Sequence, residues 1–257
     1  MGNLSMGPEY LKEEFSKLKI ALENHASIVI NDEDIKNAIK VFNESRLIYN
    51  QLNSLRVENP PSITGTDLMK FTSDFFTTEP KIWNDKTQGI LEKMKIKTQN
   101  RAINNSPRIL LSGSPLHEID FITFLEEIGL NIVYEDLCTG SKFFDLVIKD
   151  SQDILASLSE AYLNRTPCAR MMQIKERADQ IYNKAEKFKA DGVIHHSLKF
   201  CDTYLYDVPA LKKMLVEKGL NVLFIESDGG LGDINQIRTR IEAFLEIIKS
   251  WKKGEKK

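Results

Sequence analysis

Residues 190–215 read ADGVIHHSLKFCDTYLYDVPALKKML, and this stretch decides the fold class. It opens with the apolar run Gly192-Val193-Ile194, typical of a buried strand, and turns polar at His195-His196-Ser197. Lys199-Phe200-Cys201-Asp202 then leads into a predicted helix, whose apolar positions are Leu205, Val208, Leu211, Met214 and Leu215. Open parallel α/β sheets are built from such strand-to-helix units, and they place ligands at the carboxyl ends of the strands.

The same pattern occurs three more times in the second half of the chain. Short apolar runs predict further strands at 108–112, 131–134 and 221–225. Between and after these strands, the helical spacing of apolar residues predicts helices at 117–128, 143–148, 153–163, 169–189 and 234–251. Strands that alternate with helices predict right-handed crossovers and an α/β fold with a small doubly wound, parallel, four-stranded, flavodoxin-like sheet.

The first hundred residues carry no strand signal. Helical spacing indicates four helices, at 8–24, 31–56, 64–76 and 79–97. The proline pair in Asn59-Pro60-Pro61 ends the second of them. We therefore predict two domains: a helical region over residues 1–105, and an α/β parallel-sheet domain over residues 106–257 with a cysteine-bearing carboxyl edge.

The composition of the chain argues against several classes of function. The 257 residues are 42% hydrophobic and 28% charged, with a formal net charge of -2, which is ordinary for a globular protein and argues against nucleic acid as a partner. No apolar run approaches the roughly 20 residues that span a bilayer. The N-terminal MGNLSMGPEY lacks the features of a signal peptide, so we expect no membrane association and a cytoplasmic location. No P-loop, GxGxxG or HExxH motif is present.

Polar side chains follow each predicted strand, and in a parallel sheet they gather at one edge. The segments concerned are Ser112-Gly113-Ser114, Glu135-Asp136-Leu137-Cys138, His195 to Cys201, and Glu226-Ser227-Asp228. The serine-glycine segment fits either an anion cradle or a simple turn. The two histidines fit either ligands or locally hydrogen-bonded side chains. Glu135 and Asp136 fit either helix caps or groups that orient a ligand.

The chain has three cysteines, Cys138, Cys168 and Cys201, and an odd number argues against a disulfide framework. Cys168 and Cys201 are predicted to precede helices that start at the carboxyl edge, so all three thiols can converge there. They are then either inert thiols or ligands of an iron–sulfur cluster with one iron open to another ligand. A closed zinc site would need His195 or His196 as the fourth ligand.

Several of these motifs together resemble the 2-hydroxyacyl-CoA dehydratase and benzoyl-CoA reductase family. The motifs, in chain order, are PRILLSGSP (107–115), EDLCTG (135–140), Pro167-Cys168, DGVIHHSLKFCD (191–202), ESD (226–228) and QIRTRIEAF (236–244). Asn43-Glu44-Ser45-Arg46 and Pro60-Pro61 fit the middle region of the family. Asn235 stands where the family usually has glycine. The resemblance covers essentially the whole chain.

The resemblance implies an oxygen-sensitive lyase of anaerobic amino-acid fermentation, built from two related subunits that each hold a [4Fe–4S] cluster through three cysteines. It also implies a separate ATP-dependent iron–sulfur activator protein that delivers one electron to a CoA thioester substrate. The resulting ketyl radical expels the α-hydroxyl group, and the β proton is lost, so a 2-hydroxyacyl-CoA becomes an enoyl-CoA and water.

For the site, the resemblance makes Cys201 a cluster ligand and Cys138 and Cys168 further candidates; it assigns no catalytic residue. Family subunits have an N-terminal α/β domain, which supplies two cluster cysteines, ahead of the helical region. We therefore expect this chain to correspond to the C-terminal part of a subunit. That leaves open whether the chain alone binds a cluster or is active.

Two other interpretations stay open at this point. One is a reductase-type or double-cubane-cluster protein of the same superfamily. The other, from a different class, is a cluster-free scaffold or interaction fragment that pairs with a partner through its helical region. Bound iron with a broad brown absorbance favours either enzyme interpretation, whereas a colourless folded protein favours the scaffold.

Overall fold

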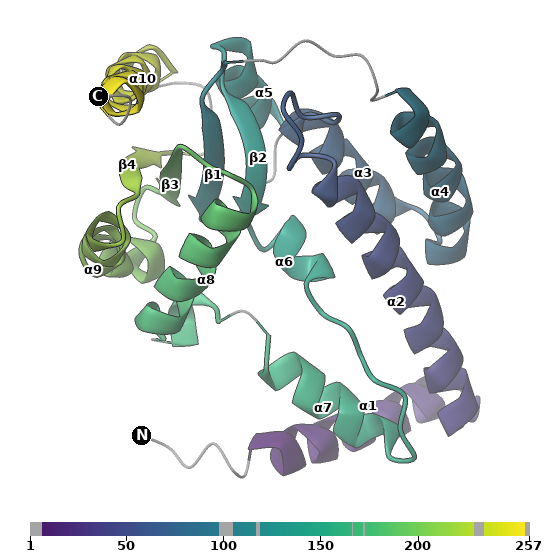
Figure 1. Cartoon of the computed structure of the whole chain (residues 1–257). Helices are drawn as coiled ribbons and strands as arrows, with labels where there is room; N and C mark the ends of the chain where they lie inside the picture. The colour runs from purple at the N-terminus through teal and green to yellow at the C-terminus, as the bar shows by residue number, and fades with distance from the viewer. Residues whose placement is uncertain are drawn as a thin grey trace.

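The computed structural model describes residues 7–97, 105–116, 119–165, 167–171, 173–228 and 234–254. A parallel sheet with helices on both faces lies beside a group of long helices from the first hundred residues (Figure 1). The predicted α/β fold with a parallel four-stranded sheet is confirmed. None of the described helices is long and apolar enough to cross a bilayer.

The sheet has the strand order expected of a doubly wound fold. Its strands are β1 (Arg108–Gly113), β2 (Asn131–Asp136), β3 (Gly192–Leu198) and β4 (Asn221–Ser227), all parallel, in the order β2-β1-β3-β4. The chain moves outward from β1 to β2 and then returns to place β3 on the other side of β1. This reversal makes a topological switch point at the carboxyl ends of β1 and β3, where such sheets bind ligands.

Helices cover both faces of the sheet because alternate strand residues point to opposite sides. Ile109 and Leu111 of β1 pack into a core with α5 (Asp120–Glu127) and α10 (Ile234–Gly254). Leu110, between them, packs into a second core with helices on the other face, which are α8 (Ile174–Lys187) and α9 (Asp202–Glu217). All six residues of β1 are buried, as expected of a central parallel strand.

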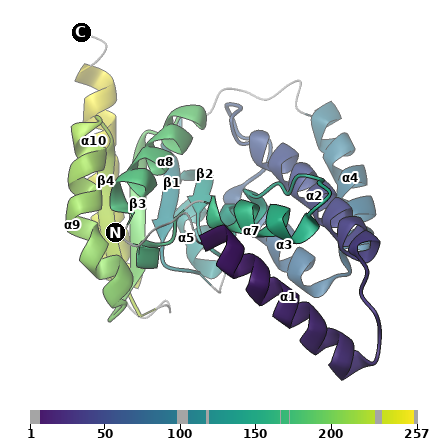
Figure 2. The ribbon, with the colours of Figure 1, turned by 90° about the horizontal axis from the view of Figure 1, so that it is seen from below.

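The helical region has a core of its own. Its helices are α1 (Gly7–Ala26), α2 (Asp32–Ser54), α3 (Gly65–Thr77) and α4 (Pro80–Lys97), close to the predicted bounds. The buried core residues include Tyr49, Leu52, Leu68, Phe75, Trp83 and Leu91, and Phe144 of α6 (Ser141–Phe144) joins them. Helix α1 has no buried residue and packs against α7 (Ile154–Leu163) at the side of the molecule (Figure 2).

Two helix predictions were wrong in their bounds. The helix expected over 143–148 ends at Phe144, because Asn43 binds both backbone groups of Ile148 and holds that segment non-helical (2.7 and 3.2 Å). The helix expected from Ala169 is preceded by a short 3-10 turn, η3 (Ala169–Met171), and α8 begins at Ile174. Of the helix expected over 117–128, residues 117 and 118 lie outside the described residues, and α5 begins at Asp120.

The helical region and the sheet are joined through buried polar contacts. The guanidinium of Arg108, at the start of β1, donates to the carbonyl oxygens of Arg56 (2.7 Å) and Glu58 (2.9 Å). The carboxylate of Glu126 accepts from the first amides of α3, Gly65 (2.6 Å) and Thr66 (3.0 Å), where a negative charge suits the helix dipole. The division of the chain into two domains at residue 105 stays a prediction.

Candidate functional site

At the carboxyl edge of the sheet, a glycine allows the ends of the two central strands, β1 and β3, to approach each other closely. Gly113, at the end of β1, has a φ of 126°, and a Cβ atom there would lie 1.8 Å from the carbonyl oxygen of His196. The next amide, Ser114 N, donates to the same oxygen at 2.9 Å. Only glycine permits this approach, which brings the end of β1 against the end of β3.

Side chains that follow the four strands do meet at this edge, as predicted. Ser112 Oγ donates to Asp136 Oδ2 (3.0 Å), which joins β1 to β2. His196 Nε2 and Ser227 Oγ are 2.8 Å apart and join β3 to β4, so one ring nitrogen of this histidine is satisfied locally. Ser114 Oγ accepts from the amide of Leu198 (3.2 Å), so the predicted serine-glycine segment acts as a turn between strands.

A group of buried polar side chains lies beneath this edge, and we call it the buried polar cluster. Its members are Lys142, Arg177, His195 and Tyr204, each at most 5% exposed. One nitrogen of Arg177, Nη1, pairs with Asp207 Oδ2, and Lys142 Nζ lies 3.1 Å from Asp136 Oδ2, without the alignment of a hydrogen bond. The cluster therefore joins α6, α8 and α9 to the end of β3.

Burial keeps two members of this cluster neutral. Burial, followed by the nearby charges of Arg177 and Lys142, lowers the pKa of His195 to about 3. The imidazole is therefore uncharged at neutral pH, with one donor and one acceptor nitrogen. Burial also raises the pKa of the Tyr204 hydroxyl above its usual range, and the neighbouring Cys138 thiol acts in the same direction.

The three predicted cysteines lie at the same end of the molecule. Cys138 is exposed in the turn after β2, Cys168 is half-buried just before η3, and Cys201 is half-buried at the N-cap position of α9. Cys138 and Cys168 both lie near enough to Tyr204 for a negative charge on either thiol to raise the pKa of the Tyr204 hydroxyl. Since the long helix begins at Ile174, only Cys201 lies at the start of a long helix, as predicted.

A metal centre needs more than this proximity. Across the residues that the structure describes, no three His, Cys, Asp or Glu side chains lie close enough together to hold one metal ion. This absence concerns a single ion, whereas the cysteine ligands of a [4Fe–4S] cluster bind different irons and lie farther apart. Ligation of a [4Fe–4S] cluster by Cys201, Cys138 and Cys168 stays a prediction.

The surroundings of Cys201 have two unusual features. Phe200, the residue before it, has a φ of 62° and is 91% exposed, a costly backbone conformation for a bulky residue and one found mainly at functional sites. A cleft of about 900 Å³ lies between η3 and α9, next in the chain to Cys168 and Cys201. Its lining includes Ala169, Arg170, Ile174, Leu205 and Tyr206.

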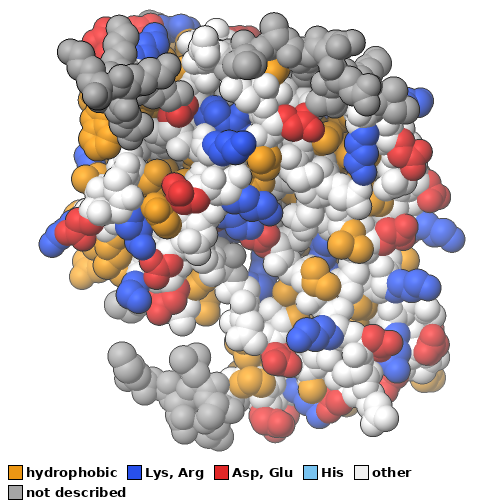
Figure 3. Space-filling view, in the orientation of Figure 1, with side chains coloured by type: hydrophobic (Ala, Val, Ile, Leu, Met, Phe, Trp, Pro, Cys, Tyr) orange, Lys and Arg blue, Asp and Glu red, His pale blue; other side chains and the backbone are white. Residues whose placement is uncertain are grey.

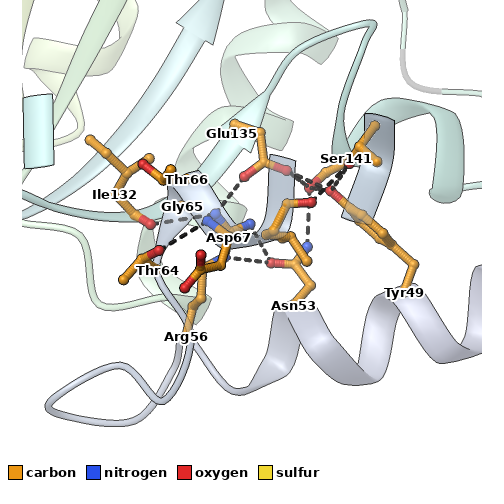
Figure 4. Close-up of polar contacts among 12 residues, drawn as sticks. Tyr49, Asn53, Arg56, Thr64, Gly65, Thr66, Asp67, Ile132, Glu135 and Ser141 are labelled. Carbon is orange, nitrogen blue, oxygen red and sulfur yellow. Dashed lines mark hydrogen bonds and ion pairs between the residues drawn. The ribbon is translucent and has the colours of Figure 1, made fainter. Parts of the chain in front are cut away.

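A second polar group lies where helix α2 meets strand β2, and we call it the α2–β2 network. Figure 4 shows its members, Tyr49, Asn53 and Arg56 of α2 with Glu135 of β2 and Ser141 of α6. The Glu135 carboxylate pairs with Arg56 Nη1 (2.5 Å) and accepts from the hydroxyls of Tyr49 (2.8 Å) and Ser141 (2.6 Å). Glu135 therefore holds α2 and α6 against β2 and is not a helix cap, one of the two roles expected for it; the ligand-orienting role stays a prediction.

The α2–β2 network also fixes the turn that holds Cys138. A Cβ atom on Gly140 would lie 2.9 Å from Glu135 Cγ, so this turn packs directly against the buried carboxylate. Ser141, the next residue, donates to that carboxylate. The position of Cys138 thus depends on contacts made by the helical region.

The face seen in Figure 3 has no large patch of one charge. Lysine and arginine side chains alternate with acidic ones over it, and the face is hollowed between the sheet side and the α7 side. A pocket of about 330 Å³ lies between α7 and α8, lined by Asp145, Glu160, Asn164, Arg165 and Gln180 among others. On this face the basic and acidic side chains are mixed, in keeping with the net charge of -2.

Sequence reasoning missed most of the buried polar cluster. Tyr204 and Asp207 lie on the helix that begins after Cys201, each next in the chain to a position assigned to the apolar face of that helix. Arg177 lies on α8, thirty residues before its partner Asp207, and no local pattern links the two. Lys142 has no feature in the sequence that marks it as buried. The one available signal was His195, a polar residue at the end of an apolar strand.

A doubly wound sheet with thiols at its carboxyl edge defines an α/β protein of the kind that binds ligands at that edge. Comparison with known proteins gives the family. Residues 5–248 match the family model described as "2-hydroxyglutaryl-CoA dehydratase, D-component". Because the match covers nearly all of the chain, this protein belongs to that family.

Individual relatives agree with this assignment. The chain is 28% identical to the (R)-phenyllactyl-CoA dehydratase beta subunit of Clostridium sporogenes, over 95% of the chain and 65% of that protein. It is 21% identical to the lactoyl-CoA dehydratase subunit beta of Anaerotignum propionicum, over 95% of the chain and 66% of the relative. It is 23% identical to a benzoyl-CoA reductase subunit of Thauera aromatica, over 96% and 64% respectively. The chain thus spans slightly less than two thirds of these relatives.

Proposed function

We propose that this chain forms part of a subunit of a 2-hydroxyacyl-CoA dehydratase, which removes water from a 2-hydroxyacyl-CoA. The observation that carries the proposal is the family match over residues 5–248, which takes in both the helical region and the sheet. The names of the dehydratase beta subunits among the relatives support the same reaction.

The chemistry of this reaction explains the partners that the proposal includes. The hydroxyl group leaves from the α carbon and the proton from the β carbon, so the products are an enoyl-CoA and water. Because the β proton of the ground-state thioester is not acidic, one electron must first enter the thioester, and it returns after water has left. We therefore propose a related second subunit, an ATP-dependent iron–sulfur activator protein and a CoA thioester as partners.

Within this proposal, Cys201 is the cluster ligand of the present chain. It is half-buried at the N-cap of α9, where a helix N-terminus favours a negatively charged ligand, and it lies beside the cleft between η3 and α9. Cys138 and Cys168 are the candidates for the remaining ligands in this chain, and the alternative is that a further part of the subunit supplies them. A cluster would provide one-electron chemistry that side chains lack.

The test uses the full chain, produced without oxygen together with a related second subunit and the activator. Phenyllactyl-CoA, lactoyl-CoA and 2-hydroxyglutaryl-CoA are supplied, and the enoyl-CoA product is detected by mass spectrometry. We expect ATP-dependent product from at least one thioester, and we expect its loss in Cys201→Ser. Iron and acid-labile sulfide per complex, measured in both proteins, report ligation separately from turnover.

An iron-loaded complex that dehydrates none of the three thioesters would contradict the proposal. The match to a benzoyl-CoA reductase subunit supplies the second candidate, a reductase-type protein, so the same complex is also given benzoyl-CoA. Consumption of benzoyl-CoA alone would favour that candidate. A complex with no iron that remains folded would favour the cluster-free scaffold.

A further inference from the structure

The buried polar cluster contains more unpaired polar atoms than its role in the fold requires. Among the described residues, Arg177 Nε and Nη2, Tyr204 Oη and both ring nitrogens of His195 have no hydrogen-bond partner, and Lys142 Nζ has only its ion pair with Asp136 Oδ2. Buried polar groups in proteins are nearly always paired, so unpaired atoms in one place need an explanation. The atoms belong to four neighbouring side chains from four different elements, so chance is a poor explanation of their grouping.

These side chains face one another. The rings of His195 and Tyr204 are 5.9 Å apart between centroids, and the guanidinium carbon of Arg177 lies 5.5 Å from the centre of the Tyr204 ring. The charges of Arg177 and Lys142 both act on the His195 imidazole. Arg177, Tyr204 and His195 therefore lie against one another, and Lys142 lies near enough for its charge to act on His195.

Most of these atoms are donors that lack an acceptor; the exception is one ring nitrogen of neutral His195, which is itself an acceptor. Arginine and lysine only donate hydrogen bonds, and tyrosine and neutral histidine each offer one further donor. The nearest carboxylates are already engaged, because Asp207 pairs with Arg177 Nη1, and Asp136 accepts from Ser112 and faces Lys142. We propose that the buried polar cluster is a binding site for one small oxyanion, a carboxylate or a phosphate group.

Charge balance adds a condition on this site. The charged and titratable groups around His195 come from β2 (Asp136), α6 (Lys142), α8 (Arg177), β3 (His196) and α9 (Asp207, Tyr204), with the thiols of Cys138 and Cys168 beyond Tyr204. The two positive charges, on lysine and arginine, already balance the two negative charges, on the aspartates. An added anion therefore enters with a proton, and the neutral imidazole of His195 can take it up.

Calorimetric titration of the full chain with acetate and, separately, with inorganic phosphate tests this proposal at constant ionic strength. We expect saturable binding of at least one of the two, which also tells a carboxylate source from a phosphate source. In two buffers of different ionisation enthalpy, binding should show uptake of about one proton. Tyr204→Phe and His195→Leu should each weaken binding about tenfold or more, because a hydrogen bond to a charged group is lost.

Tyr182→Phe is the matched control, since Tyr182 is a partly buried tyrosine of α8 that contacts Lys218 and lies outside the buried polar cluster. Binding in this control should equal that of the unchanged chain. Absence of saturable binding, equal binding in Tyr204→Phe, or binding without proton uptake would each overturn the proposal. Unfolding of Tyr204→Phe would also overturn it, because it would reveal a protein partner of the hydroxyl. The titration needs neither iron nor a CoA thioester, so its failure is separate from failure of the proposed dehydratase.

Discussion

The α2–β2 network and the buried polar cluster differ in one respect. Both lie under the carboxyl half of the sheet, and both contain a buried arginine, a buried tyrosine and a carboxylate. In the α2–β2 network the Glu135 carboxylate is bound by Arg56, Tyr49 and Ser141. In the buried polar cluster the tyrosine hydroxyl and most of the arginine nitrogens are unpaired among the described residues.

This difference separates a structural role from a binding role. A satisfied buried network rigidifies a protein, whereas a partly satisfied one costs free energy that folding alone does not recover. In the α2–β2 network the Glu135 carboxylate is bound by one cation and two hydroxyl groups, although its Oε2 atom has only the ion pair with Arg56 and no hydrogen bond among the described residues. The effect of this network is to join the helical region to the sheet and to fix the turn of Cys138. The buried polar cluster is incomplete within the described residues, as expected of a site that awaits a ligand.

The largest expected effect comes from removing the cation of the α2–β2 network. Arg56→Met should lower the free energy of unfolding by about 3–5 kcal/mol, because it leaves the fully buried Glu135 carboxylate without its cation. Urea unfolding measures the change. The control is Lys86→Met, which removes an exposed ion pair with Asp74 and should cost less than about 1 kcal/mol.

The double variant Arg56→Met with Glu135→Leu sharpens the interpretation. Removing both charges should restore part of the lost stability, since no buried charge is then left unpaired. Equal losses in Arg56→Met and Lys86→Met would contradict the structural role assigned to the α2–β2 network.

The comparison also shows how far the sequence alone reaches. The four strands and their order of appearance were predictable, because each is a short apolar run bounded by turn residues. Cys201 was correctly placed at a helix start, because a helical pattern follows it at once. The bounds around Phe144 and Ala169 were not predictable, since a distant side chain, Asn43, decides the first of them.

Neither buried network could be assembled from the sequence. Glu135 follows a strand and resembles an edge residue, and only the packing of α2 against β2 turns it into one half of an ion pair with Arg56. The partners Arg177 and Asp207 lie on successive helices and meet only because α8 and α9 cover the same face of the sheet. Polar contacts between elements depend on tertiary packing, which local periodicity does not encode.

A second prediction concerns the pH dependence of stability. Burial lowers the pKa of His195 to about 3 and that of His196 to about 4, while the unfolded chain takes up these protons near pH 6.5. Below about pH 6.5 the unfolded state therefore binds more protons, and the free energy of unfolding falls as the pH falls. Between pH 7 and pH 5 the loss should be about 2 kcal/mol for each of the two histidines.

Urea unfolding over this pH range checks the prediction. His195→Leu should remove its own share of the slope, and His25→Gln, which changes an exposed histidine at the end of α1, should leave the slope as it is. An unchanged slope in His195→Leu would mean that this imidazole has a partner that stabilises its charged form, and the buried polar cluster would then be paired, like the α2–β2 network.

The smallest and most direct test is the same change in both regions. Tyr49→Phe removes the hydroxyl that donates to Glu135 but keeps the ring, which stacks on Phe144 at 3.8 Å, so it should cost about 1–2 kcal/mol. Tyr204→Phe removes a buried hydroxyl with no partner among the described residues, and without added anion it should change stability by less than about 0.5 kcal/mol.

The two variants differ only in the hydrogen bonds that the lost oxygen made. The difference between their changes in the free energy of unfolding therefore shows how completely each tyrosine hydroxyl was paired. Urea unfolding in a buffer free of phosphate and carboxylates gives that difference, and added acetate or phosphate should widen the cost of Tyr204→Phe while leaving that of Tyr49→Phe unchanged. Equal costs before any anion is added would show that Tyr204 is already paired. The distinction between a paired structural network and a waiting site would then fail.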